Sequence, residues 1–118
     1  MVASEPKRAF VYMVRCADGS HYTGLCTDPG KRMREHAERT AACAKYTRSH
    51  PVVALDALWK TGSRSDAARL EALIKRLSKA KKLALIERPV TLGAVFGEKL
   101  DAEAYEAVPR DAFSPFFP

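Results

Sequence analysis

The sequence predicts a small α/β protein of the α+β type, because it combines short strand-like runs with helical periodicity. Residues 9–16, AFVYMVRC, and 20–26, SHYTGLC, are rich in β-branched and aromatic residues, and an Asp-Gly turn signal lies between them. Residues 51–59, PVVALDALW, are apolar enough to lie inside a small sheet. Residues 66–87 place apolar side chains at helical spacing. At 118 residues, the chain fits one domain with one core.

The turn between the first two strands decides whether Tyr12 and Tyr22 share a face of the sheet. A two-residue Asp-Gly turn places them on opposite faces. A three-residue Ala-Asp-Gly loop places them on one face, with Tyr12 opposite Gly24 and Tyr22 opposite Val14. We favour the three-residue loop, because Gly19 suits the left-handed position that closes such a loop. Either tyrosine taken alone is also compatible with simple packing.

A first helix is expected to follow the hairpin. Thr27 or Asp28 can cap a helix that begins at Pro29, where a missing amide proton costs nothing. Arg32 and His36 stand four residues apart and therefore share a face of this helix. That face could carry a function, or it could simply be exposed to solvent. The next stretch, TAACAKYTRSH, shows no clean period, and we expect a loop there.

A second, longer helix is expected over residues 66–87, capped by Ser65 and ended before Pro89. Glu71 borders the apolar stripe of this helix. Because a buried carboxylate is costly unless it is paired or bound to a metal, Glu71 is a candidate metal ligand. The alternative is an exposed Glu71 paired with Lys75 at a favourable helix spacing.

Charge separates the middle of the chain from its end. The net charge is +6, and basic residues outnumber acidic ones over residues 45–88, whereas acids predominate over residues 89–118. The basic middle could bind a polyanion such as nucleic acid, or could be a solvated surface. No apolar run approaches the roughly 20 residues of a membrane helix, so we expect no membrane partner and a cytoplasmic protein.

Four short motifs occur in order: FVY, YTG ten residues later, KRMREH on the first helix and ARLEALIKRL on the second. Together they resemble the GIY-YIG nuclease superfamily, and more narrowly its small single-domain bacterial branch, which has similar RCADGS, AKYTR and IKRLS stretches. The resemblance covers about residues 9–88. We therefore expect residues 1–88 to form a GIY-YIG-like nuclease domain. Residues 89–118 would form an acidic, aromatic extension that packs on this domain or on a protein partner, or is partly disordered.

The resemblance implies a three-stranded antiparallel sheet flanked by helices, with an active site on one face. It implies five catalytic residues: Tyr12, Tyr22, Arg32, His36 and Glu71. Glu71 would hold one Mg²⁺ or Mn²⁺, and Arg32 would grip phosphate oxygens. A tyrosine, with Tyr12 favoured, would orient or deprotonate the attacking water, and His36 would be its supporting group or an alternative base. The chain departs from the family pattern at Phe10, where the first Gly is absent, and at Leu25, where several active nucleases carry Lys.

The function expected from the resemblance is a metal-dependent endonuclease that acts on nucleic acid with weak sequence preference; DNA is favoured over RNA as the substrate, and the sequence leaves both open. Basic residues would then contact phosphates on either side of the cut; these are Lys45, Arg48, Lys75, Arg76, Lys79, Lys81 and Lys82. Two alternatives remain. One is a nucleic-acid-binding module with the nuclease fold but little activity or partner-dependent activity. The other is an adaptor that binds a protein partner through the tail RDAFSPFFP.

Overall fold

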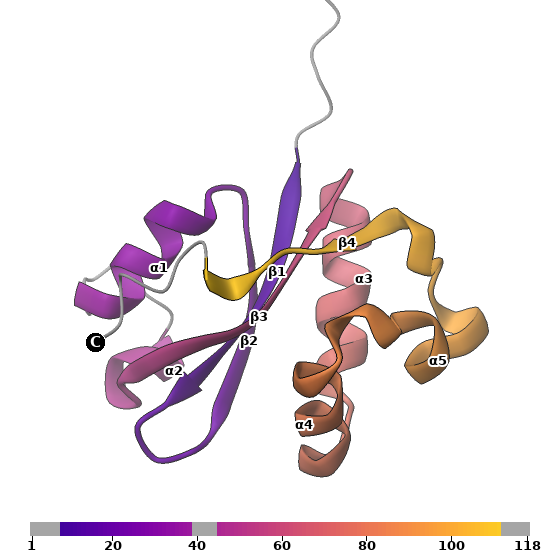
Figure 1. The fold of residues 1–118 in the computed structure, drawn as a ribbon. Helices are drawn as coiled ribbons and strands as arrows, with labels where there is room; N and C mark the ends of the chain where they lie inside the picture. The colour runs from indigo at the N-terminus through magenta and orange to yellow at the C-terminus, as the bar shows by residue number, and fades with distance from the viewer. Residues whose placement is uncertain (1–7, 39–44, 112–118) are drawn as a thin grey trace, which may run out of the picture.

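The computed structural model describes residues 8–38 and 45–111, and it has a four-stranded antiparallel sheet at its centre (Figure 1). The strand order is β2-β1-β3-β4. The strands are β1 (Ala9–Cys16), β2 (His21–Cys26), β3 (Val52–Thr61) and β4 (Tyr105–Ala107). The expectation of three strands is therefore wrong. The fourth strand comes from the acidic extension, and its three residues are too few to show a strand pattern in the sequence.

Helices cover both faces of the sheet, and Figure 1 shows α1 and α2 on one side and α3, α4 and α5 on the other. The helices are α1 (Pro29–Glu38), α2 (Lys45–Ser49), α3 (Arg64–Lys75), α4 (Lys79–Glu87) and α5 (Leu92–Phe96). Short 3-10 turns lie at η1 (Pro89–Thr91), η2 (Gly97–Lys99) and η3 (Ala102–Ala104). The α+β class predicted from the sequence is confirmed.

Alternation along β1 divides the buried side chains into two clusters. Val11 and Met13 point toward α3 and pack with Leu70 and Ile74. Tyr12 and Val14 point the other way and belong to a cluster that includes Met33 of α1. Because side chains alternate along a strand, each face of the sheet has its own core. Tyr12 therefore lies on the α1 side.

The hairpin between β1 and β2 has the three-residue loop that the sequence favoured. Gly19 has a φ of 86°, the left-handed conformation that glycine adopts without strain. The amide of Cys16 donates to the carbonyl of Ser20 at 2.8 Å and closes the loop. Tyr12 pairs with Gly24 and Val14 with Tyr22, so the register is confirmed and both tyrosines lie on one face.

Asp56 interrupts the apolar pattern of β3, and a bulge explains it. Met13 pairs with Ala57 and Val14 with Leu55, so Asp56 is an extra residue between two pairs. Its carboxylate lies 2.8 Å from Nε2 of His21. Because of this bulge, the two residues that flank Asp56 lie on opposite faces of the sheet. Ala57 packs in the cluster on the α3 side, and Leu55 packs in the cluster that contains Tyr12.

Three predictions about the helices need correction. The expected long helix divides into α3 and α4, because Ser78 takes an extended conformation and its hydroxyl accepts from the amide of Lys81 at 3.2 Å. The cap of α3 is Ser63 rather than Ser65, and its hydroxyl accepts from the amide of Asp66 at 3.0 Å. The stretch expected to be a loop contains α2.

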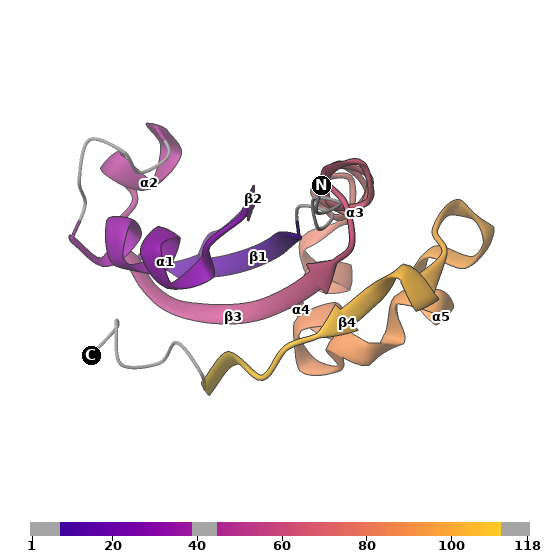
Figure 2. The same ribbon diagram turned by 90° about the horizontal axis from the view of Figure 1, so that it is seen from above.

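The extension joins the rest of the fold through the sheet and the core. Strand β4 pairs with β3 from Trp59 to Thr61. Three side chains of the extension are buried in the α3-side cluster; they are Leu92, Phe96 and Leu100. In Figure 2, β4 follows the edge of β3 before the chain reaches its C-terminal end. The end expected to be partly disordered, residues 112–118, lies outside the described residues.

Candidate active site

Tyr12 is at the centre of a buried polar cluster. It is 0% exposed, and its hydroxyl accepts a hydrogen bond from Nε of Arg32 at 3.1 Å and lies 2.9 Å from Nε2 of His36. Arg32 and His36 stand one turn apart on α1, so one helix face presents both to the sheet. Burial raises the pKa of Tyr12 above its usual range, although the hydrogen bond and charge of Arg32 oppose the rise. The hydroxyl is therefore protonated in the free protein.

His36 is the second buried polar group of the cluster, with 1% exposure. Burial lowers the pKa of His36 to about 4, the charge of Arg32 lowers it further, and Glu35 opposes the shift. The imidazole is thus neutral at neutral pH. Its Nδ1 lies 3.1 Å from Oγ1 of Thr47 on α2, so both ring nitrogens have hydrogen-bond partners.

Gly24 makes room for the two tyrosines. A Cβ atom at this position would lie 2.5 Å from the hydroxyl oxygen of Tyr12 and 2.9 Å from Cε2 of Tyr22. Both distances are far below van der Waals contact, so a larger residue would displace the ring of Tyr12. A glycine inside a strand often marks close approach of another group, so the sequence carries a signal for this contact beyond the role of Gly24 as a register partner of Tyr12.

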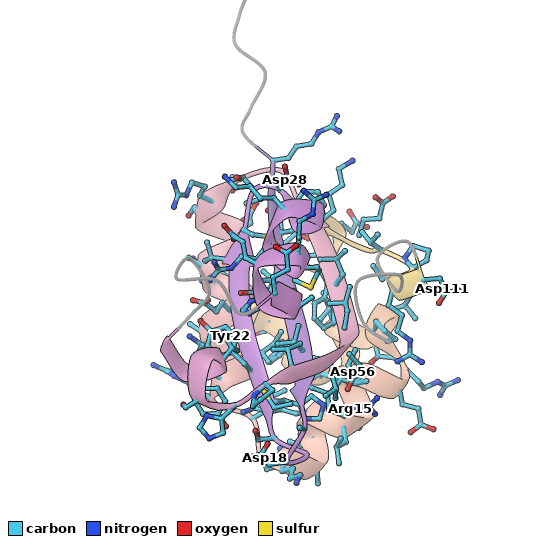
Figure 3. All side chains as sticks on the ribbon, turned by 90° about the vertical axis from the view of Figure 1, so that its left-hand side faces the viewer. Arg15, Asp18, Tyr22, Asp28, Asp56 and Asp111 are labelled. Atoms are coloured by element: carbon cyan, nitrogen blue, oxygen red, sulfur yellow. The ribbon has the colours of Figure 1, made fainter. Side chains whose placement is uncertain are left out.

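Tyr22 lies at the outer side of the cluster and is partly exposed. Its ring centroid is 6.2 Å from that of Tyr12 and 6.1 Å from that of His36, and it stacks on Tyr46 at 5.9 Å. Figure 3, a view of the α1 and α2 side, shows Tyr22 beside α2. Burial raises the pKa of Tyr22, with a smaller rise from the charge of Glu71 and an opposing effect of Arg32.

Glu71 approaches this cluster from the other side of the sheet. It lies on α3, which packs on the opposite face but also contacts the edge strand β2. The Glu71 side chain is 23% exposed, and its Oε2 is 3.7 Å from Nζ of Lys75. The Lys75 ammonium in turn lies 5.8 Å from the ring centroid of Tyr22. The predicted residues therefore surround the edge strand β2 and are not confined to one face.

The two ionic groups of the cluster are both paired within α-helices. Nη1 of Arg32 lies 3.2 Å from Oε1 of Glu35, while Glu71 pairs with Lys75. Both pairs are partly exposed, so each is worth about 0.2 to 1 kcal/mol and can exchange for a ligand. Glu35 was not among the residues singled out from the sequence.

The donor atoms of the cluster fit one hard divalent cation. The described residues contain no group of three or more His, Cys, Asp or Glu side chains that could hold a metal. Mg²⁺ accepts one or two carboxylates and keeps several waters, so a single partly exposed Glu71 is a chemically adequate donor. A soft or fully protein-ligated metal would require more ligands than this cluster provides.

Most predicted phosphate contacts are solvent-accessible on α3, α4 and their junction. Lys75, Arg76, Lys79 and Lys81 are exposed and Lys82 is partly exposed. The side chains of Lys45 and Arg48 lie outside what the structure describes. Among the described residues, no helix is both long enough and apolar enough to cross a membrane.

Comparison with known proteins identifies the fold that this cluster belongs to. A family model described as the GIY-YIG catalytic domain matches residues 8–84. The chain belongs to the GIY-YIG family. The resemblance inferred from the four motifs is thus confirmed.

Similar GIY-YIG proteins carry the name UPF0213. One from Fusobacterium nucleatum is 46% identical over 80 residues, which cover 68% of this chain and 78% of the relative. The UPF0213 protein YhbQ of Escherichia coli is 38% identical over 93 residues, which cover 79% of this chain and 87% of the relative. The solution NMR structure of a UPF0213 protein from Bacillus halodurans is 41% identical, covers 68% of this chain and 83% of its own, and has a TM-score of 0.45.

The departures from the GIY-YIG pattern have clear places in the structure. Phe10, which replaces the first glycine, is partly buried against the cluster that contains Tyr12. Leu25 packs against the core on the α3 side, so its side chain points away from the two tyrosines. Lys75 places an ammonium beside Tyr22. Lys75 is therefore a cation close to Tyr22, whereas Leu25 contributes none.

Sequence reasoning missed two site residues in the AKYTR stretch. Thr47 contacts His36, and Tyr46 stacks on Tyr22. Both lie on α2, which has five residues and no apolar period. The one available signal was the resemblance of this stretch to the family. That resemblance did not assign a role to Tyr46 or to Thr47.

Proposed function

We propose that this protein is a metal-dependent endonuclease that hydrolyses phosphodiester bonds in nucleic acid, with DNA as its expected substrate and weak sequence preference. The observation that supports the proposal most is the hydrogen-bonded group of Tyr12, Arg32 and His36 in a chain of the GIY-YIG family. The group combines a proton donor, a permanent cation and a neutral base in one place.

Arg32 is proposed to bind the scissile phosphate. Its guanidinium is planar, always charged and donates through several N–H groups, which suits non-bridging phosphate oxygens. In the free protein the guanidinium contacts Tyr12 and Glu35. Phosphate binding would replace the partly exposed Glu35 contact, at a modest cost in free energy.

Tyr12 and His36 are proposed to remove the proton from the attacking water. Tyr12 is fully buried in the free protein, so its hydroxyl must first become accessible to water. The movement of Arg32, which donates to this hydroxyl, toward the phosphate is the proposed opening step. Tyr12 then takes a proton from water while its own proton moves to Nε2 of His36, which is neutral and 2.9 Å away. Hydroxide attacks phosphorus, and the leaving oxygen takes a proton from solvent.

Glu71 is proposed to bind the divalent cation, Mg²⁺ or Mn²⁺. When bound, such a cation neutralises phosphate charge and acts as a Lewis acid. Glu71 must first exchange its contact with Lys75, whose ammonium is then available to a phosphate oxygen. The exposed lysine and arginine side chains of α3, α4 and their junction would position the nucleic acid through contacts with its phosphates. Such contacts carry little sequence information.

The test is cleavage of a labelled panel of single-stranded, duplex and branched DNA and RNA in Mg²⁺, in Mn²⁺ and in EDTA. We expect cleavage in either metal and none in EDTA. Binding that weakens steeply with salt but leads to no cleavage under any condition would contradict the proposal and would identify a nucleic-acid-binding module.

A further inference from the structure

Thr47 is a buried polar residue beside the proposed catalytic group, and it has no assigned role. It is 1% exposed, and its Oγ1 lies 3.1 Å from Nδ1 of His36, a residue that is itself 1% exposed. In such a site, the direction of each hydrogen bond matters, because an unsatisfied buried donor or acceptor is costly.

The geometry around Tyr12 determines which nitrogen of His36 carries the proton. Nε of Arg32 can only donate, so the oxygen of Tyr12 is the acceptor in that bond. The hydroxyl proton of Tyr12 is then directed to Nε2 of His36, which accepts it. A neutral imidazole with an accepting Nε2 carries its proton on Nδ1, and this N–H donates to Thr47.

The opposite tautomer fits the same contacts poorly. If Nε2 of His36 carried the proton, the oxygen of Tyr12 would receive two hydrogen bonds, one from Arg32 and one from His36. The hydroxyl proton of Tyr12 would then have no acceptor among the hydrogen bonds of the described residues. Thr47 therefore has a defined task, which is to accept from Nδ1.

We propose that Thr47 is a positioning residue that holds His36 in the Nδ1-protonated tautomer and so keeps Nε2 available for the proton of Tyr12. The proposal rests on the proposed nuclease function, since it gives the tautomer a role in the reaction. In this role Thr47 acts on the reaction through His36.

Helix α2 is held in the place that this role requires. The residue before Thr47 is Tyr46, whose ring stacks on Tyr22 and whose hydroxyl donates to Oγ of Ser20 at 2.8 Å. The Tyr46 ring also stacks on His50, with a centroid distance of 3.9 Å. One short helix thus contacts Tyr22 through Tyr46 and His36 through Thr47, and the hairpin anchors it.

The test uses Thr47→Val, which removes the hydroxyl at similar volume, and Thr47→Ser, which keeps it. The ¹⁵N chemical shifts of His36 report its tautomer without any need for activity. We expect a protonated Nδ1 in the native protein and in Thr47→Ser, and a shift of the population toward protonated Nε2 in Thr47→Val. Thr23→Val is the control, because Thr23 is also buried, at 4% exposure.

The rate of cleavage provides the second measurement. We expect kcat to fall about tenfold in Thr47→Val, the rate equivalent of one misdirected hydrogen bond, with substrate affinity unchanged and with recovery in Thr47→Ser. An unprotonated Nδ1 in the native protein overturns the proposal, and so does a Thr47→Val protein with the native tautomer and rate. If Thr47→Val does not fold, two other measurements test the proposal: the tautomer of His36 in the native protein and the cleavage rate of Thr47→Ser. The proposal then requires a protonated Nδ1 and a rate close to the native one. A protonated Nδ1 in a protein that cleaves nothing would leave the tautomer assignment intact and overturn the nuclease proposal and, with it, the catalytic role of Thr47.

Discussion

The hydroxyl oxygen of Tyr12 lies 2.9 Å from Nε2 of His36, although the two residues are 24 positions apart in the sequence. The hairpin register turns Tyr12 toward the α1 side, and α1 presents His36 one turn after Arg32. The contact joins the first strand to the first helix and places a phenol beside a neutral base. The proposed chemistry depends on this contact.

Replacing Tyr12 by Phe should remove the proton transfer while it preserves the packing of the ring. We expect cleavage to fall at least about a hundredfold, as is typical when a proton-transfer group is lost, and stability to fall by about 1 kcal/mol. Cleavage kinetics and urea unfolding measure the two effects. The matched control is Tyr105→Phe, which removes a hydroxyl that donates to the carbonyl of Asp66 at 2.6 Å. Equal loss of cleavage in both variants would contradict the role of Tyr12.

Gly24→Ala should damage the site through sterics alone. The added methyl would lie 2.6 Å from Cζ of Tyr12, so the ring must move away from Arg32 and His36. We expect a loss of about 1 to 3 kcal/mol in unfolding free energy, the usual cost of overpacking, together with loss of cleavage. Gly62→Ala is the control, because a Cβ there meets nothing within 4 Å. Unaltered thermal unfolding of Gly24→Ala would show that the tyrosines are not packed as described.

Folding stability should depend on pH through His36. Four titratable or charged groups face its imidazole: Tyr12, Tyr22, Arg32 and Glu35. The pKa of His36 is lowered from 6.5 to about 4, so the unfolded chain binds more protons between these values. Stability should therefore fall as the pH falls from about 6.5 to 4, by about 3 kcal/mol from this residue, and should level below that range.

The measurement for His36 is urea unfolding at several pH values, compared with His36→Gln, which does not titrate. The difference in unfolding free energy between the two proteins isolates the histidine from the other groups. We expect the native protein to lose more stability than the variant across this window. Parallel pH profiles for the two proteins would mean that His36 titrates normally in the folded state.

Lys75→Met should alter the metal requirement. In the free protein Lys75 pairs with Glu71 at 3.7 Å, and a cation must replace that contact. A pair of this kind is worth about 0.2 to 1 kcal/mol, so its removal should lower the Mg²⁺ concentration for half-maximal cleavage by up to about fivefold. Titration of activity with Mg²⁺ checks this, with Lys79→Met as the control because Lys79 is exposed on α4. A higher Mg²⁺ requirement in Lys75→Met would contradict the proposed competition between Lys75 and Mg²⁺ for Glu71.

Local signals in the sequence were sufficient to predict the hairpin of β1 and β2, which carries the two tyrosines of the site. Gly19 in an Asp-Gly turn was enough to predict the loop, and the loop sets the register that brings Tyr12 and Tyr22 to one face. The start of α1 could also be predicted, since Pro29 begins the helix and Asp28 accepts from the amide of Lys31. These features depend on residues that are close in sequence.

Features that depend on distant contacts could not be predicted in this way. Strand β4 forms because its three residues pair with β3, and helix α2 forms in a stretch that lacks an apolar period. Ser78 divides the expected long helix, although apolar spacing continues on both sides of it. For the same reason Thr47, on α2, carried no signal of its own, since its contact with His36 joins residues 11 positions apart on two different helices.

The central claim is that Glu71 supports metal-dependent cleavage, and single-turnover cleavage by Glu71→Gln in Mg²⁺ tests it most directly. The substitution keeps the size of the side chain and removes the charge that a divalent cation needs. The control is Glu103→Gln, which alters an exposed carboxylate on η3. We predict that Glu71→Gln folds, binds DNA and does not cleave, whereas Glu103→Gln cleaves at the native rate. Cleavage by Glu71→Gln at the native rate in Mg²⁺ would contradict the account.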